Sequence, residues 1–198
     1  MDFNSISQER KRELALLTQF IQEKKDSSTP ILINFVCTHN SRRSQFSQIW
    51  AQVASDYYHI EAQCFSGGVE ETAFNERAVA SLKRFGFEII SEEETNPKYS
   101  VTWKSEATPL VLFSKIFDDS VNPTSGFAAI MICSHADENC PFVTGCEKRI
   151  PIRYEDPKKY DDTSLESAFY DYRSFEIATE LFYVFSKVKQ CTNNLLEN

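Results

Sequence analysis

The sequence lacks any long hydrophobic run. No stretch of its 198 residues approaches the roughly 20 apolar residues that a membrane-spanning helix needs. Charges lie where a secretory signal peptide has its apolar core, in the opening residues MDFNSISQERKRELALL. Internal repeats and low-complexity tracts are also absent. These features predict a cytoplasmic protein that does not associate with membranes.

Positive charge is scarce as well. Lys and Arg number 21 against 29 Asp and Glu, which gives a formal net charge of -8. An acidic chain repels the nucleic-acid backbone, so we expect no nucleic-acid partner, and any bound anion must be captured locally. Hydrophobic residues make up 41% of the chain, a globular composition that excludes disorder for most of it. This length suits one sizeable core, so we expect a single domain.

Apolar patterning along the chain alternates between strands and helices. The predicted elements, in order, are a helix over 5–25, a strand over 31–37, a helix over 44–58, a strand over 59–68, a helix over 74–86, strands over 108–117 and 126–133, and a helix over 163–190. The polar stretches 91–107 and 118–125 contain proline and are predicted surface connections, with a hairpin around 99–103. The alternation is typical of a doubly wound α/β sheet.

The loop between the first predicted strand and its helix has the composition of an anion site. It reads Cys37-Thr38-His39-Asn40-Ser41-Arg42-Arg43-Ser44. A short loop that closes onto a helix N-terminus can turn backbone N–H groups inward, and the helix dipole adds positive potential there. We expect residues 38–42 to surround a tetrahedral oxyanion and the Arg43 guanidinium to bind two of its oxygens.

The same field favours a thiolate at Cys37, beneath the central atom of the oxyanion, and makes it a nucleophile. We expect Ser44 to hydrogen-bond this sulfur and stabilise it as a leaving group. The alternative is that Cys37 is a buried thiol at a strand end, with Arg42 and Arg43 as solvated charges at the helix start.

This loop resembles the phosphate-binding loop of the low-molecular-weight protein tyrosine phosphatase superfamily, which includes the thioredoxin-coupled arsenate reductases. The superfamily pattern is Cys-x-Gly-Asn-x-Cys-Arg-Ser. It is matched by Cys37, Asn40, Arg43 and Ser44, whereas His39 replaces the Gly and Arg42 replaces the second Cys.

The resemblance extends over residues 30–186. It implies a single α/β domain whose four-stranded parallel sheet is flanked by helices on both faces. It also divides the chain into an extra N-terminal amphipathic helix, residues 1–28, and a phosphatase-like or reductase-like domain, residues 29–198.

A second segment, residues 133–146, bears on the choice between reductase and phosphatase. Cys133 ends a predicted strand, so it should lie at the same sheet edge as Cys37. The segment resembles the thioredoxin-coupled arsenate reductases, because a second cysteine, Cys140, follows seven residues later with a proline after it. An Asp-Pro pair, Asp156-Pro157, lies further downstream, as in those reductases.

The resemblance implies a relay of three thiols that reduces arsenate to arsenite. Cys37 attacks the arsenic, and Cys133 attacks the Cys37 adduct and releases arsenite. Cys140 then attacks Cys133 and leaves a Cys133–Cys140 disulfide for thioredoxin, while Asp156 assists proton transfer. The implied partners are therefore thioredoxin and an oxyanion substrate.

Other interpretations stay open at this point. A protein tyrosine phosphatase would hydrolyse phosphomonoesters through a Cys37 phosphocysteine, with Asp156 protonating the leaving group. A third interpretation is a non-catalytic module that binds an oxyanion or a phosphoprotein, should His39 distort the loop. For Cys133 the alternative is an inert core thiol, and for Cys140 and Cys146 it is a zinc site with His135. Their spacing lacks a Cys-x-x-Cys knuckle, so we predict no metal and no cofactor.

Overall fold

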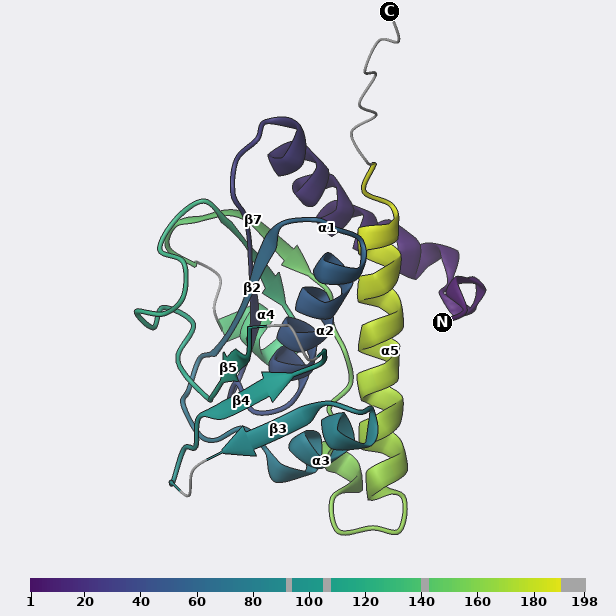
Figure 1. Cartoon of the computed structure of the whole chain (residues 1–198), viewed down its shortest axis with the longest axis vertical. Coiled ribbons are helices and arrows are strands. Elements are labelled where there is room, and N and C mark those ends of the chain that lie inside the picture. Colours follow the sequence, from purple (N-terminus) through teal and green to yellow (C-terminus); the bar gives the residue numbers. More distant parts are fainter. Residues whose placement is uncertain (92–93, 105–107, 140–142, 190–198) are drawn as a thin grey trace, which may run out of the picture.

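The computed structural model describes residues 1–91, 94–104, 108–139 and 143–189 (Figure 1). Its main sheet has four parallel strands in the order β2-β1-β6-β7. Their bounds are Ile31–Cys37 for β1, Ala62–Gly68 for β2, Phe127–Met131 for β6 and Cys146–Pro151 for β7. Strand β6 is buried along its whole length, because a central parallel strand is covered on both faces. The predicted single-domain α/β fold with a four-stranded parallel sheet is confirmed.

Helices cover both faces of this sheet. They are α1 (Gln8–Asp26), α2 (Arg43–Tyr57), α3 (Glu76–Arg84), α4 (Ser134–Asn139) and α5 (Glu166–Ser186), with short 3-10 turns at Phe3–Ser5 and Pro157–Tyr160. From β1 the chain crosses through α2 to β2 on one side, and from β6 through α4 to β7 on the other. Since such crossovers are right-handed, α2 and α4 lie on opposite faces. The predicted arrangement of helices is therefore confirmed.

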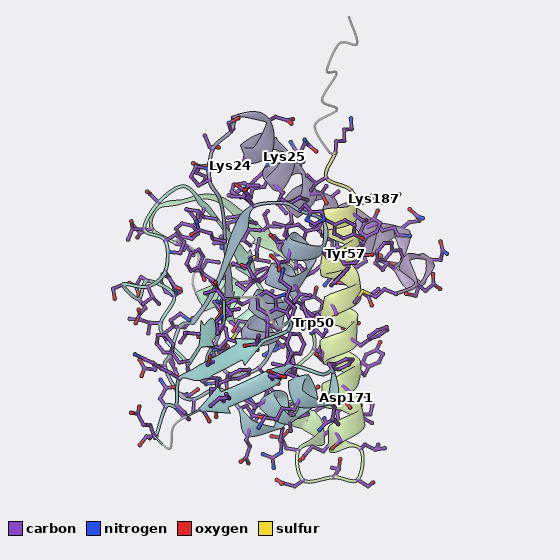
Figure 2. The ribbon with its side chains drawn as sticks, in the orientation of Figure 1. Lys24, Lys25, Trp50, Tyr57, Asp171 and Lys187 are labelled. Carbon is purple, nitrogen blue, oxygen red and sulfur yellow. The ribbon has the colours of Figure 1, made fainter. Side chains whose placement is uncertain are left out.

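Helices α2 and α5 pack side by side, with α3 next to them (Figure 1). Trp50 of α2, labelled in Figure 2, lies at this junction and donates its indole N–H to the Ser174 hydroxyl of α5 at 2.9 Å. Its ring meets Phe85 and Phe87 edge-on, at centroid distances of 5.6 and 5.1 Å. This cluster fixes the helix that follows the predicted anion loop.

The predicted N-terminal helix is present as α1. The Ser7 side chain caps it by accepting from the Arg10 N–H at 3.1 Å. Its apolar stripe is buried against α5 and β7, and consists of Leu14, Leu17, Phe20 and Ile21. Within the described residues, three ion pairs join it to the rest of the chain: Arg10 with Glu180 at 2.9 Å, Lys24 with Glu147 at 2.6 Å and Glu23 with Lys148 at 3.7 Å.

A second sheet lies beside the first and is antiparallel, with β3 (Glu88–Ser91), β4 (Tyr99–Thr102) and β5 (Leu110–Leu112) in that order. The predicted hairpin around 99–103 corresponds to β4. The strand predicted over 108–117 is wrong in extent: only Leu110–Leu112 is a strand, and it belongs to this second sheet. Val111 is half exposed while Leu112 is buried, the alternation of an antiparallel strand with one solvated face.

The fourth strand of the main sheet is β7, which the sequence analysis did not identify. It lies at the edge of the sheet, and only Ile150 among its six residues is buried. An edge strand of this kind has no apolar run to mark it. None of the helices in the described ranges is long and apolar enough to cross a membrane.

Candidate active site

The Cys37 sulfur lies inside a turn of chain between the end of β1 and the first turn of α2. The residue is only 4% exposed. Its sulfur is 3.0 Å from the Ser44 hydroxyl and accepts the Asn40 backbone N–H at 3.2 Å. The structure therefore brings Cys37 and Ser44 together, in the arrangement that the sequence predicts.

Asn40 gives the turn its shape. Its backbone is left-handed, with φ at 46°, a conformation that Asn tolerates better than most residues. The side-chain amide donates to the Ser44 hydroxyl at 2.8 Å and accepts the Lys115 N–H at 3.1 Å. His39 has no left-handed backbone, and its half-exposed ring lies 3.4 Å from the Glu70 carboxylate. The loop therefore accommodates a side chain at the position where the superfamily pattern has glycine.

The carbonyl groups of the loop all point to donors outside it. Cys37 O accepts from Val69 N, Thr38 O from Glu70 N, His39 O from the Ser114 and Thr72 hydroxyls, Asn40 O from the Gln45 amide, Ser41 O from Asn75 N and Arg42 O from Phe46 N, at 2.8 to 3.1 Å. With its carbonyls paired in this way, the loop presents its N–H side to the space around the Cys37 sulfur. That is the polarity that an anion requires.

Gly68, the last residue of β2, lies directly against the loop. A Cβ atom at this position would stand 2.8 Å from both Asn40 N and Thr38 O, and 2.6 Å from Glu70 O. Such distances are too short for any side chain. Glycine is needed here because two backbone segments approach each other closely.

Arg43 and Asp156 form an ion pair at the mouth of the loop. The guanidinium donates to the Asp156 carboxylate at 2.6 Å and to the Tyr154 carbonyl at 2.9 Å. The second carboxylate oxygen of Asp156 accepts the Lys158 N–H at 3.0 Å and caps the turn Pro157–Tyr160. A cavity of about 810 Å³ opens beside this pair. The structure thus brings two further predicted site residues together, with the Arg43 fork bonded to protein groups.

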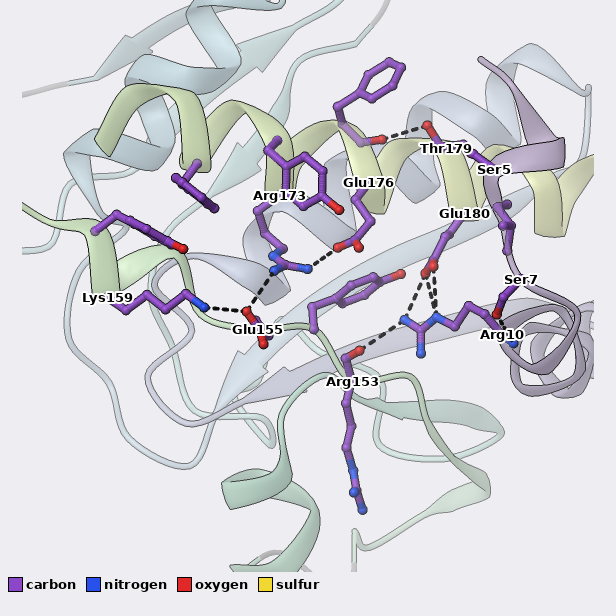
Figure 3. Close-up of a pocket in the computed structure, with 16 residues that line it drawn as sticks. Ser5, Ser7, Arg10, Arg153, Glu155, Lys159, Arg173, Glu176, Thr179 and Glu180 are labelled. Atoms are coloured by element: carbon purple, nitrogen blue, oxygen red, sulfur yellow. Dashed lines mark hydrogen bonds and ion pairs between the residues drawn. The ribbon is translucent and has the colours of Figure 1, made fainter. Parts of the chain in front are cut away.

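A group of charged residues contacts the segment of chain next to Asp156 (Figure 3). Arg10 donates to the Arg153 carbonyl at 3.1 Å. Glu155 lies 2.7 Å from Lys159 and 3.8 Å from Arg173 of α5. These contacts line a second cavity, of about 830 Å³, which shares residues 153–155 and Lys159 with the first. They fix the position of Asp156 relative to α1 and α5.

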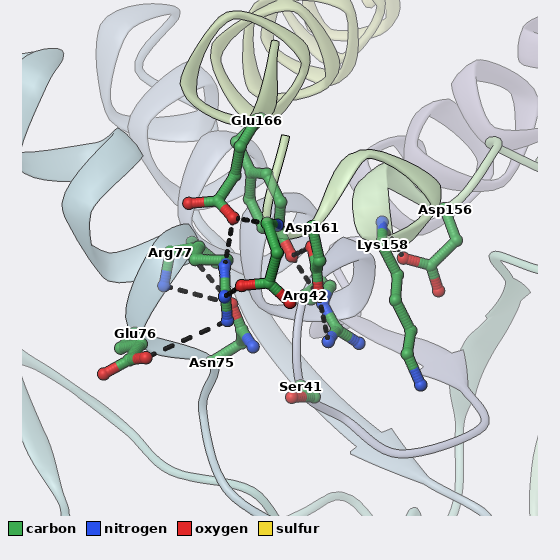
Figure 4. Close-up of polar contacts among 12 residues, drawn as sticks. Ser41, Arg42, Asn75, Glu76, Arg77, Asp156, Lys158, Asp161 and Glu166 are labelled. Carbon is green, nitrogen blue, oxygen red and sulfur yellow. Dashed lines mark hydrogen bonds and ion pairs between the residues drawn. The ribbon is translucent and has the colours of Figure 1, made fainter. Parts of the chain in front are cut away.

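The Arg42 side chain leaves the loop. It donates to the Tyr170 hydroxyl at 2.8 Å and lies 3.6 Å from Asp161, which also accepts the Tyr170 hydroxyl (Figure 4). Burial and the bond to Asp161 raise the pKa of Tyr170, so its hydroxyl stays neutral. The positive charge of Arg42 therefore lies against Asp161 and Tyr170 instead of facing the anion site. The Arg42 side chain ties the loop to α5.

Cys133 follows β6 and lies beside the loop, as expected for two neighbouring strand ends. It is 4% exposed, and its sulfur is 3.5 Å from the Thr38 hydroxyl and accepts the Ala136 N–H at 3.4 Å. Cys140 lies outside the described residues, as do Pro141 and Phe142. Among the residues that the structure describes, no group of three His, Cys, Asp or Glu side chains could hold a metal ion.

The sequence analysis missed several residues that build this site, namely Gln45, Gly68, Thr72, Asn96 and Ser114. They act through single hydrogen bonds or through the absence of a side chain, and no motif marks them. Only Gly68 carried a signal, as part of the Gly-Gly pair that ends β2.

The strand order and the flanking helices give this chain the fold of the low-molecular-weight phosphotyrosine phosphatases. Among solved structures, such a phosphatase from Vibrio cholerae O395 matches 79% of this chain and 94% of its own, with a TM-score of 0.52 and 14% identity. A structure titled as an arsenate reductase in the phosphate-binding state matches 80% of this chain and 99% of its own, with a TM-score of 0.50 and 16% identity. At such identities these matches establish the fold.

The sequence relatives are arsenate reductases. Arsenate reductase 2 of Staphylococcus epidermidis is 28% identical over 126 residues, 63% of this chain and 77% of the reductase. Arsenate reductase of Staphylococcus aureus is 27% identical over the same length. No family model matches the sequence. The predicted resemblance to this superfamily, on the side of its arsenate reductases, is confirmed, and so is the prediction of an enzyme, since these sequence relatives are arsenate reductases.

Proposed function

We propose that this protein reduces arsenate to arsenite, with Cys37 as the nucleophile. The observation that carries the proposal is the position of Cys133, whose sulfur lies 3.5 Å from the Thr38 hydroxyl of the anion loop. A hydrolase uses water as its second nucleophile and has no need of a thiol there. The sequence relatives named above, which are arsenate reductases, support the same reaction.

In the first step, arsenate binds against the N–H side of loop 37–44. The Cys37 thiolate attacks As(V), and one arsenate oxygen leaves as water after it has taken up protons. Bonds from Asn40 N–H and Ser44 to the sulfur support the thiolate. The product is a covalent Cys37–S–As(V) adduct.

In the second step, the Cys133 thiolate attacks the Cys37 sulfur. The S–As bond breaks and its electron pair stays on arsenic, which becomes As(III) and departs as arsenite. The two thiols lose the two electrons that arsenic gains and form a Cys37–Cys133 disulfide. Cys140 then attacks Cys133, which frees Cys37 and leaves a disulfide for the thioredoxin dithiol to reduce. The part of Cys140 rests on the sequence alone.

The pair of Arg43 and Asp156 suggests how the leaving oxygen receives its proton. An oxyanion in the loop competes with Asp156 for the Arg43 guanidinium, since both are anions within reach of one cation. When Arg43 turns to the oxyanion, the Asp156 carboxyl is released from the ion pair beside the substrate. Asp156 is then a general acid beside the substrate.

The test is Cys133→Ser, assayed with arsenate, thioredoxin, thioredoxin reductase and NADPH, and separately with an aryl phosphate. We expect the variant to lose multiple-turnover arsenate reduction and to keep any aryl-phosphate hydrolysis of the wild type. Cys64→Ala is the matched control, since Cys64 is equally buried but lies within β2 and burial raises the pKa of its thiol. That control should keep both activities.

Two results would contradict the proposal. One is arsenate turnover that survives unchanged in Cys133→Ser, which would remove Cys133 from the reaction. The other is a wild-type protein that hydrolyses aryl phosphate but does not turn over arsenate, which would favour a phosphatase.

A further inference from the structure

One peptide unit of the anion loop, between His39 and Asn40, is gripped at both ends. Its N–H, on Asn40, donates to the Cys37 sulfur at 3.2 Å. Its carbonyl, on His39, accepts two hydroxyls, from Ser114 at 2.9 Å and Thr72 at 3.1 Å. The direction of this peptide decides whether a donor or an acceptor faces the nucleophile.

The observed orientation of this peptide is unfavourable for the Asn40 backbone. It requires the left-handed backbone at φ 46°, which is disfavoured for a residue with a side chain. A half-turn of the peptide would relieve Asn40 and bring the His39 carbonyl toward the sulfur. A carbonyl dipole there would repel both a thiolate and an oxyanion. The peptide therefore needs bonds that hold its carbonyl outward.

Ser114 is placed to supply such a bond. It is fully buried, and its hydroxyl accepts the Thr72 N–H at 2.9 Å while it donates to His39 O. Hydrogen bonds in such a chain polarise one another, so the bonds at the carbonyl strengthen the N–H that meets Cys37. Ser114 acts on the sulfur through the peptide and makes no contact with it.

Asn96 fixes Ser114 in turn. Its side-chain amide accepts the Ser114 N–H at 3.2 Å and donates to the Ser114 carbonyl at 2.7 Å. Asn96 belongs to the connection between β3 and β4, and Ser114 follows β5. The small antiparallel sheet therefore reaches the anion loop through two polar residues.

We propose that Ser114, held by Asn96, is a positioning residue that keeps the His39–Asn40 peptide in the direction that activates Cys37. This inference rests on the proposed role of Cys37 as nucleophile. It gives the second sheet a function, because the sheet sets the reactivity of a thiol that it does not contact. Thr72 is a second support for the same carbonyl.

The experiment measures alkylation of Cys37 by iodoacetamide as a function of pH, followed by mass spectrometry of the peptide that contains Cys37. For Ser114→Ala we expect alkylation at pH 7 to slow about three- to tenfold, which corresponds to the loss of one hydrogen bond. We also expect the midpoint of the pH profile to rise. Thr72→Val should act in the same direction, and the double variant should exceed the sum of the two, because no hydroxyl then holds the carbonyl. Asn96→Ala should give a smaller shift.

Ser114→Ala and Thr72→Val leave the charged side chains around the loop in place, among them His39, Glu70, Arg42, Arg43, Lys115 and Asp156, whereas Asn96→Ala also frees the Glu71 carboxylate from its 3.1 Å bond to the Asn96 amide. A change in the pH profile therefore reflects the orientation of the His39–Asn40 peptide. The matched control is Ser81→Ala, which removes an equally buried serine whose hydroxyl bonds to Asp171, away from the loop. It should leave the profile unchanged.

A folded Ser114→Ala/Thr72→Val protein with the wild-type profile would overturn the inference. Should Ser114→Ala fail to fold, Thr72→Val decides the matter, since Thr72 is exposed and its loss leaves no buried gap. A wild-type protein inactive on arsenate would refute the proposed function and leave the alkylation test intact.

Discussion

Each of two neighbouring strands of the main sheet leads to a cysteine, since β1 ends at Cys37 and Cys133 follows β6, and the chain is held very differently after each. After β1, the loop 37–44 is fastened by hydrogen bonds to every carbonyl from residue 37 to 42. After β6, the short helix Ser134–Asn139 is tied down through Asp137, which pairs with Arg149 and Arg153. Arg153 is about half exposed, so part of this second attachment lies at the surface, while Ala136 of the same helix is buried in the core.

The difference fits the two tasks proposed for the cysteines. A group that binds an anion must keep its dipoles fixed, because dipoles that reorient cost free energy at the moment of reaction. A thiol that passes a disulfide to the next cysteine must change partners, and the chain around it must move. Substitutions in the loop 37–44 should therefore change the rate of the reaction. Substitutions in the helix 134–139 should change local stability.

The largest expected effect lies on the rigid side. Cys37→Ser removes the nucleophile, and Arg43→Ala removes the cation that faces the oxyanion, so each should reduce arsenate turnover by about a thousandfold or more. The coupled assay with thioredoxin and NADPH measures this. If Cys37→Ser retained most of its turnover, the loop would not be the active site, and the proposed difference between the two strand ends would be wrong.

The second prediction concerns the stability of the chain behind the loop. Burial lowers the pKa of Lys115 to about 8, with Asp119 opposing the shift. Replacing it, as Lys115→Met, removes a buried charge and should raise the free energy of unfolding at pH 7 by about 2 kcal/mol. Urea unfolding measures the gain.

The pH dependence of this gain has a definite sign. An unfolded lysine titrates near 10.5, so between about pH 8 and 10.5 the unfolded state binds more protons and wild-type stability rises with pH. Below pH 8 both states are charged and the cost is constant. The advantage of Lys115→Met should therefore be full at pH 7 and vanish above about 10.5; a gain that persists there would mean that packing, not charge, explains it.

The smallest effect is expected on the other side, at Asp137. Burial opposes its charge, but the bonds and charges of Arg153 and Arg149 outweigh burial and lower the pKa of Asp137 below its usual 3.8. Its contribution is thus present above that pH and lost as the pH falls through the lowered value. Asp137→Asn should cost about 1 kcal/mol and speed hydrogen exchange in 134–139 severalfold at pH 7.

The loop 37–44 serves as the internal control in that experiment. Its exchange should be the same in Asp137→Asn and in the wild type. Equal acceleration of hydrogen exchange in both segments would show that the two strand ends open together. That result would contradict the proposed difference between them.

The sequence predicts those elements whose burial is continuous. The strand over residues 31–37 is correct at both ends, because a central parallel strand is apolar on both faces. The helix predicted from residue 44 begins at Arg43. Strand β7 was missed because its polar side chains face solvent and pair with α1, as Lys148 does with Glu23 at 3.7 Å. Local pattern cannot reveal an edge strand that long-range pairing creates.

The same limit applies to the site. The spacing of Cys37, Arg43 and Ser44 is local, so the sequence indicates it. The destination of the Arg42 side chain depends on Tyr170, 128 positions away, and the support from Ser114 comes from 75 positions away. Such partners become neighbours only through the fold, and small hydroxyl residues carry no distinguishing pattern.

The first helix has a consequence for the order in which the chain folds. Its buried stripe, including Leu14 and Phe20, packs against α5 and β7, which lie more than a hundred residues further along. On the ribosome, α1 emerges before α5 and β7, so the part of its apolar face that they cover stays exposed until those elements have been made. These contacts of α1 therefore form late in synthesis, and the nascent chain is open to aggregation for that interval.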